Sequence, residues 1–203
     1  MAVYSFSDKN DPSYNACTDI HSNRMSLYIS GYERATELLL ANVLDNRNNL
    51  DSLVYPIMYN YRHYLELSFK ELIWLCKQLT QAQKEFTAVT GNDLKFVKYR
   101  NDEHSLGKCW NKVLVGLREV EPELPSKLIS QISKVVEEFN NLDKSGQSFR
   151  YPENRNWQDT LSDKRYINLV SVAKSFNQTR PQIDQLFSWL LSMQERIYEN
   201  PVK

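Results

Sequence analysis

The stretch from Tyr55 to Cys76, YPIMYNYRHYLELSFKELIWLC, constrains the fold of this chain more than any other. Its apolar residues recur at intervals of three and four positions, which is the spacing of one face of an α-helix. Further apolar residues widen this stripe around most of the girth. A helix of that kind is buried among other helices, so we expect it at the centre of a helical bundle. The stripe consists of Val54, Met58, Tyr61, Leu65, Phe69, Leu72, Cys76 and Leu79.

The same spacing recurs along most of the chain, and no strand-helix alternation interrupts it. The polar DNRNN at 45–49 either ends the first helix or continues it on a solvated face. The pattern predicts an all-α fold, a bundle of about five to six helices in one domain over 23–203, after a flexible N-terminal arm over 1–22. We expect a first helix from about residue 23, further helices over about 51–80, 105–120, 125–142, 164–177 and 181–198, a loop over 81–103, and a short irregular or hairpin insertion near 145–160.

Charged residues lie in the middle of the central helix. Arg62, Glu66 and Lys70 are four residues apart, so their side chains stack on one face and opposite charges can pair. One interpretation is an internal ion-pair ladder that fixes helix packing. In the other, Arg62 and Lys70 present cations to a phosphate and Glu66 orients them.

Two of the three histidines are candidates for a chemical role. His63 follows Arg62, about 100° round the helix, and is either a hydrogen-bonded packing residue or a proton carrier. His104 begins HSLGKCW, just before a helix, where it could cap that helix or reach into a cleft. No two histidines are three or four residues apart, so the sequence predicts neither a metal site nor a cofactor.

The segment FRYP, from Phe149 to Pro152, places an arginine between two aromatic residues. In a structural interpretation both aromatics plug the bundle and Arg150 pairs with a carboxylate such as Glu66. In a functional interpretation Arg150 lies near a phosphate or base, where its planar guanidinium suits bidentate contact, and Tyr151 contributes to binding.

Composition and missing motifs argue against several classes of function. Lys plus Arg and Asp plus Glu both number 25, so no overall field attracts nucleic acid or an anionic membrane. The three cysteines are far apart and form no CxxC, which argues against disulfides and zinc. The motifs of nucleotide-binding loops, zincins and serine hydrolases are missing from the sequence. With a polar N-terminus and no long apolar run, we expect a cytoplasmic protein without membrane contact.

Five segments in order resemble a family of uncharacterised bacterial HEPN-like proteins. They are GYERATELLL, LVYPIMYNYRHYLELSFKELI, HSLGKCW, VVEEFNNLDKSGQSFRYP and YINLVSVAKSF, which together span about residues 28–177. The resemblance implies a HEPN-type helical bundle, often dimeric, and a role in toxin–antitoxin systems, phage defence or RNA processing. As the resemblance implies, its catalytic members are metal-independent ribonucleases that use an arginine and a histidine with four to six residues between them.

This chain departs from that catalytic pattern. Arg62 and His63 are adjacent, and only three residues separate Arg100 from His104, so the catalytic spacing is missing. The first hypothesis is therefore an RNA-binding or RNA-cleaving protein with His63 or His104 as proton carrier and Arg62 and Arg150 as phosphate clamps. The second is a non-catalytic dimerisation, protein-interaction or nucleotide-sensing module. Expected partners are RNA or a nucleotide, a second copy of the chain, and a cognate antitoxin or defence-system protein.

Overall fold

In a computed structural model of the 203-residue chain, the residues that the structure describes form five α-helices packed together. The structure describes residues 13, 15–18, 24–87, 103–123, 126–162 and 166–199, without the side chains of 84–87 and 197–199. The helices are α1 (Arg24–Asp45), α2 (Leu50–Thr87), α3 (Leu106–Val120), α4 (Ser126–Leu142) and α5 (Leu169–Glu199), with a 3₁₀ turn η2 (Arg47–Asn49) between the first two. Within these ranges no strand is present, which confirms the all-α class.

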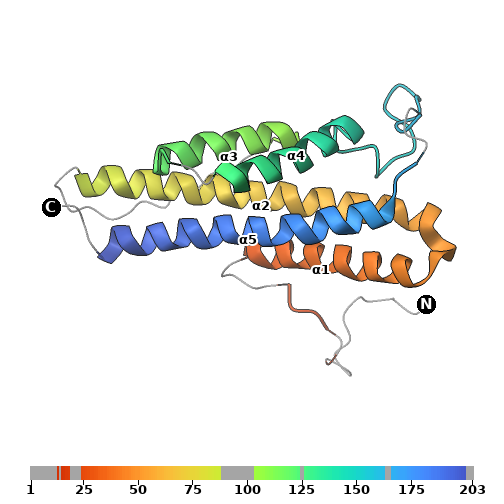
Figure 1. The fold of residues 1–203 in the computed structure, drawn as a ribbon, viewed down its shortest axis with the longest axis horizontal. Coiled ribbons are helices and arrows are strands. Elements are labelled where there is room, and N and C mark those ends of the chain that lie inside the picture. Colours follow the sequence, from red (N-terminus) through yellow and green to blue (C-terminus); the bar gives the residue numbers. More distant parts are fainter. Residues whose placement is uncertain are drawn as a thin grey trace, which may run out of the picture.

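Helix α2 lies at the centre, as its sequence predicts. It packs against α1, α3 and α5, while α4 closes the bundle between α3 and α5. The helices run roughly along one direction, with α3 and α4 on one side of α2 and α1 and α5 on the other (Figure 1). Almost all of the predicted apolar stripe is buried, including Tyr61, Leu65, Phe69 and Leu72 with 1% exposure or less.

The polar stretch after α1 ends that helix. Asn46 caps η2, where its side-chain oxygen accepts a hydrogen bond from the backbone N–H of Asn48 at 3.1 Å. The chain then enters α2 directly, and Pro56 is the seventh residue of the helix, beyond the first turn in which a proline is tolerated. The alternative of one helix continuing through DNRNN is therefore wrong.

Two predicted boundaries are also wrong. Helix α2 continues to Thr87, whereas the sequence prediction ended it near Thr80; the remainder of the predicted loop to residue 102 lies outside the described residues. The two predicted C-terminal helices are one helix, α5, with Pro181 inside it. A proline removes one backbone hydrogen bond, but apolar residues on both sides of it, including Phe176 and Ile183 with 0% exposure, continue the same buried face. That burial holds the helix together across the proline.

The insertion expected near 145–160 is present as an irregular segment between α4 and α5. It contains one isolated antiparallel bridge between Glu153 and Asp159, and Phe149 anchors it in the core. The predicted N-terminal arm falls mostly outside the described residues. In the described part of the chain, every helix is too short or too polar to span a lipid bilayer.

Candidate functional site

One face of α2 carries three of the residues that the sequence singled out, together with Tyr59. Tyr59, His63, Glu66 and Lys70 fall within about 60° of one another when 100° is allotted to each residue of the helix. We call these four residues the α2 strip. Tyr59, His63 and Lys70 are half-buried and Glu66 is buried, so the strip is where the central helix approaches solvent.

The Glu66 carboxylate is the centre of a network of hydrogen bonds. Its Oε2 accepts a hydrogen bond from Nη1 of Arg62 at 3.0 Å, and its Oε1 accepts one from Nζ of Lys70 at 2.8 Å. Oε1 also lies 2.9 Å from Nδ1 of His104. The ion-pair ladder of the first interpretation is therefore present, and it extends to a residue at the start of α3.

These partners determine the ionisation of Glu66 and the orientation of His104. Burial alone would raise the pKa of the Glu66 carboxyl, but hydrogen bonds from Lys70 and His104, with the charge of Arg62, hold that pKa below its ordinary value. The ionised carboxylate only accepts hydrogen bonds, so Nδ1 of His104 must donate. The imidazole is 73% exposed, and Nε2 has no hydrogen-bond partner within the residues that the structure describes. His104 thus offers an oriented ring nitrogen to solvent.

Arg62 is enclosed by protein. The residue is 4% exposed, its Nη2 donates to the backbone oxygen of His104 at 2.7 Å, and its Nε lies 3.8 Å from Oδ2 of Asp143. Gly146 lies against the guanidinium, where a Cβ would come within 2.6 Å of it. The structure therefore gives the Arg62 side chain internal partners rather than an open face toward a phosphate. Lys70, whose side chain is 15% exposed, is likewise engaged by Glu66.

A second group forms around Tyr59. The His63 ring stacks on Tyr59 with 5.6 Å between centroids, and its edge-to-face contact with Tyr32 of α1 has 4.4 Å between centroids. The guanidinium carbon of Arg150 lies 5.6 Å from the Tyr59 ring and 5.3 Å from the Tyr151 ring. Arg150 is exposed, so its charge is held over two aromatic faces at the surface.

The structural interpretation of FRYP expected both aromatic residues to plug the bundle and Arg150 to pair with a carboxylate such as Glu66. It is correct only for Phe149. Phe149 is buried and plugs the bundle, but Tyr151 is 51% exposed. Arg150 makes no ion pair with Glu66, whose oxygens are taken by Arg62, Lys70 and His104.

Two of the four predicted catalytic residues therefore meet at Glu66, and the other two meet at Tyr59. Arg62 and His104 form the first pair, while His63 and Arg150 lie beside the second centre. Tyr59 and Glu66 are seven residues apart, so the two centres lie about 10 Å apart along one face of α2. Three grooves on the described part of the chain are lined by residues other than His63, His104 and Arg150.

Sequence reasoning missed Asp143, Gly146 and the pair Tyr32 and Tyr59. The signal for the first two was DKSG at the end of α4, which places an acidic residue and a glycine just after a helix. That signal indicates a tight turn. It does not indicate that the turn closes on an arginine from another helix.

Burial and neighbouring charges make His63 sensitive to pH. Burial lowers the pKa of the His63 imidazole below its ordinary 6.5, and the cations Lys70 and Arg150 add to the effect against the opposing charge of Glu66. The unfolded chain then takes up the proton more readily. The contribution of neutral His63 to stability is complete above about pH 6.5 and is lost as pH falls below it.

We expect the free energy of unfolding of the wild type to fall between about pH 7 and pH 5.5 by more than that of His63→Phe. Phenylalanine keeps a ring between Tyr32 and Tyr59 but does not titrate. Urea titrations at several pH values measure the difference, and the remaining histidines are common to both proteins. Parallel pH profiles would show that His63 has the same pKa in the folded and unfolded chains.

Two of the cysteines, Cys76 and Cys109, are buried in the bundle. Burial raises the pKa of Cys109 to about 11 and that of Cys76 to about 12, which keeps both as unreactive thiols. Among the described residues, no three His, Cys, Asp or Glu side chains are arranged to hold a metal ion.

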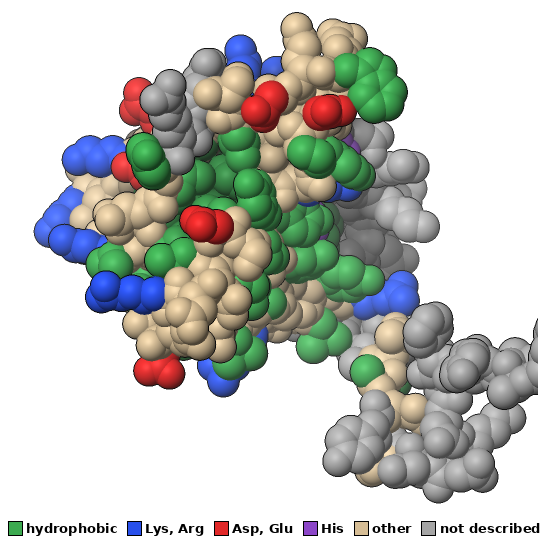
Figure 2. Space-filling view, turned by 90° about the vertical axis from the view of Figure 1, so that its right-hand side faces the viewer, with side chains coloured by type: hydrophobic (Ala, Val, Ile, Leu, Met, Phe, Trp, Pro, Cys, Tyr) green, Lys and Arg blue, Asp and Glu red, His purple; other side chains and the backbone are tan. Residues whose placement is uncertain are grey.

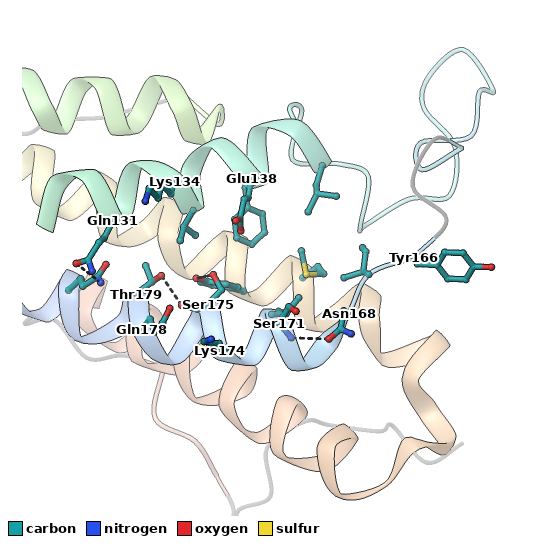
Figure 3. A pocket seen from close by; sticks show the side chains of 18 residues that line it. Gln131, Lys134, Glu138, Tyr166, Asn168, Ser171, Lys174, Ser175, Gln178 and Thr179 are labelled. Atoms are coloured by element: carbon teal, nitrogen blue, oxygen red, sulfur yellow. Dashed lines mark hydrogen bonds between the residues drawn. The ribbon is translucent and has the colours of Figure 1, made fainter. Parts of the chain in front are cut away.

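Two grooves lie elsewhere on the bundle. One, of about 800 Å³, lies where the α1–α2 turn, the irregular segment and the start of α5 meet, and hydrophobic side chains gather at that end of the molecule (Figure 2). The other, of about 570 Å³, runs between α4 and α5, with Lys134 and Glu138 on one wall and Lys174 on the other (Figure 3). Its floor includes Tyr61, whose hydroxyl lies 3.3 Å from Oγ of Ser175. Neither groove reaches the α2 strip.

Comparison with known proteins yields no match: no family model, no curated protein and no solved structure is significantly similar to this chain.

Proposed function

We propose that the protein is a HEPN-like ribonuclease of a bacterial defence or toxin–antitoxin system, which binds RNA along the α2 strip and cleaves it without a metal. The observation that carries the proposal is the exposed His104 imidazole, whose Nδ1 is bound to the buried carboxylate of Glu66 at 2.9 Å. A carboxylate at Nδ1 fixes the tautomer of a histidine that acts as a general base.

The chemistry uses the ribose 2′-hydroxyl as the nucleophile. Nε2 of His104 takes the hydroxyl proton while the 2′-oxygen forms a bond to the adjacent phosphorus. The bond from phosphorus to the 5′-oxygen breaks, and that oxygen takes a proton from the imidazolium or from water. The products are a 2′,3′-cyclic phosphate and a 5′-hydroxyl. Arg150 supplies exposed positive charge on the same face of α2, and Tyr59 and Tyr151 supply aromatic rings of the kind on which unpaired bases stack.

The test is RNA cleavage in EDTA by the wild type, His104→Ala and His63→Ala. We expect EDTA-resistant cleavage by the wild type, a loss of about 10²–10⁴-fold in His104→Ala, and a smaller effect in His63→Ala. An oligonucleotide of the same sequence made of DNA has no 2′-hydroxyl and should remain intact. Equal products from all three proteins, or inactivation of the wild type by EDTA, would contradict the mechanism.

The second candidate is a non-catalytic dimerisation, protein-interaction or nucleotide-sensing module. The enclosure of Arg62 among internal partners favours it, because that arrangement stabilises the bundle whether or not RNA binds. It predicts that the wild type leaves RNA intact, and sedimentation would show a homodimer or a complex with a cognate protein. A cleavage activity lost in His104→Ala would exclude it.

A further inference from the structure

Arg62 connects three segments that are far apart in the sequence. Its Nη1 donates to Glu66 one turn further along α2, and its Nη2 donates to the backbone oxygen of His104 before α3. Its Nε faces Asp143, the residue that follows α4. A single buried guanidinium therefore touches both the segment that carries His104 and the loop that leads to Arg150.

The loop side of this connection is built tightly. Oδ1 of Asp143 accepts hydrogen bonds from the backbone N–H groups of Gln147 at 3.0 Å and Ser148 at 3.1 Å, which folds the loop back on the end of α4. Gly146 is buried with a φ of 75°, a conformation that favours glycine. A side chain there would also meet the guanidinium at 2.6 Å. Phe149 then enters the core, and Arg150 follows it at the surface.

The burial of Arg62 separates its role from that of a group that binds substrate. Its side chain is 5% exposed and those of Glu66 and Asp143 are 4% and 1% exposed, so the charge is balanced inside the protein. Direct contact between the guanidinium and a phosphate would require the loop at Gly146 to move away. In its buried position, Arg62 fixes the segment that carries His104 relative to the loop that begins at Asp143.

We propose that Arg62 is a positioning residue that holds the exposed His104 imidazole and the exposed Arg150 guanidinium in register through the loop of Asp143 and Gly146. The expected effect of Arg62 on kcat rests on the proposed function. The expected effect on the tautomer of His104 rests on the geometry alone. It assigns a role in activity to Asp143 and Gly146, neither of which needs to touch RNA.

The first measurement is the tautomer of His104 by ¹⁵N NMR. The chain has three histidines, His21, His63 and His104, so single substitutions assign the ring signals. In the wild type, the neutral His104 ring should carry its proton on Nδ1, facing Glu66. In Gly146→Ala and in the milder Asp143→Asn, displacement of Arg62 should shift the tautomer population toward that of a free imidazole.

The second measurement is cleavage kinetics on the same proteins. A misplacement of about 1 Å in a catalytic group can reduce the rate roughly 100-fold. We therefore expect both variants to lower kcat by one to two orders of magnitude, with a much smaller change in KM. Arg62→Lys keeps the positive charge but lacks the planar guanidinium that binds two segments at once. We therefore expect kcat to be lowered in this variant as well.

Two controls separate positioning from loss of stability. Gly31→Ala makes the same substitution on an exposed turn of α1, where a Cβ meets nothing within 4 Å, and should leave both measurements unchanged. Ile183→Val removes a buried methylene from α5 and should lower stability by about 1 kcal/mol, with the His104 signals unmoved.

The outcomes are distinct. If Gly146→Ala and Asp143→Asn lower the melting temperature but leave the His104 tautomer as in the wild type, Arg62 is only a packing residue and the inference is wrong. If the wild type does not cleave RNA, the proposed function fails while the NMR result still decides the positioning role. If Gly146→Ala does not fold, Asp143→Asn decides it.

Discussion

Replacing Glu66 by alanine is expected to lower the free energy of unfolding by ~3–5 kcal/mol, the range for breaking a buried ion pair. The substitution leaves Arg62 buried with only Asp143, 3.8 Å from its Nε, to balance its charge. It also removes the partner of Lys70, whose side chain is 15% exposed. For a chain of this size the melting temperature should fall by roughly 10 °C, measured by calorimetry or circular dichroism.

Two further variants show whether the buried charge is the cause. Glu37→Ala removes ion pairs with Arg34 and Arg180 that lie at the surface, and it should change the melting temperature little. Arg62→Met combined with Glu66→Leu removes both charges of this ion pair and should recover much of the lost stability. In the double variant Asp143 keeps its hydrogen bonds from the backbone of Gln147 and Ser148. A double variant as unstable as the sum of the single ones would contradict an ion-pair origin.

Glu66→Gln is expected to reduce kcat for RNA cleavage by ~10²–10⁴-fold, with the chain still folded. The amide has nearly the shape of the carboxylate but can donate an N–H to Nδ1 of His104. That donation stabilises the His104 tautomer that carries its proton on Nε2. In this tautomer Nε2 cannot take the proton of the ribose 2′-hydroxyl. The position of the Glu66 oxygen 2.9 Å from Nδ1 makes the histidine dependent on the charge of its partner.

Glu71→Gln is the matched control for this prediction. Glu71 is a half-buried residue of the same helix, on a different face from Glu66, and burial alone raises its carboxyl pKa. Its substitution should leave kcat at the wild-type value. The tautomer of His104 in Glu66→Gln, read from its ¹⁵N signals, should change together with the rate. A kcat within a factor of two of the wild type would show that Glu66 does not orient a catalytic base.

The two predictions place stability and activity on the same carboxylate. Glu66 receives hydrogen bonds from Arg62 and Lys70, which fix the packing of α2, and from His104, which faces solvent. The ladder interpretation of Arg62, Glu66 and Lys70 therefore describes their contacts, whereas the functional interpretation, in which Arg62 and Lys70 face a phosphate, does not, because both cations are engaged by Glu66. The ladder is present, and one of its ends is an exposed imidazole.

Local signals in the sequence determined most of the helices. The stripe from Val54 to Leu79 identified the central helix because burial of one face requires apolar residues every three to four positions. The sequence prediction was wrong in placing a break between residues 177 and 181, just before Pro181; local rules count the hydrogen bond that a proline removes. They do not count the burial of Phe176 and Ile183 on either side of it, which only the packed bundle supplies.

The amino-acid sequence by itself determined that α2 carries an arginine, a glutamate and a lysine on one face, because the spacing of residues along a helix is fixed by backbone geometry. Only the tertiary structure decided which side chains these three meet. His104 reaches Glu66 because α3 packs against α2, and Gly146 closes over Arg62 because the loop after α4 folds back onto the same helix. These contacts join residues that are far apart in the sequence, and the spacing of residues along a helix does not indicate them. They follow from the packing of the helices and the loop.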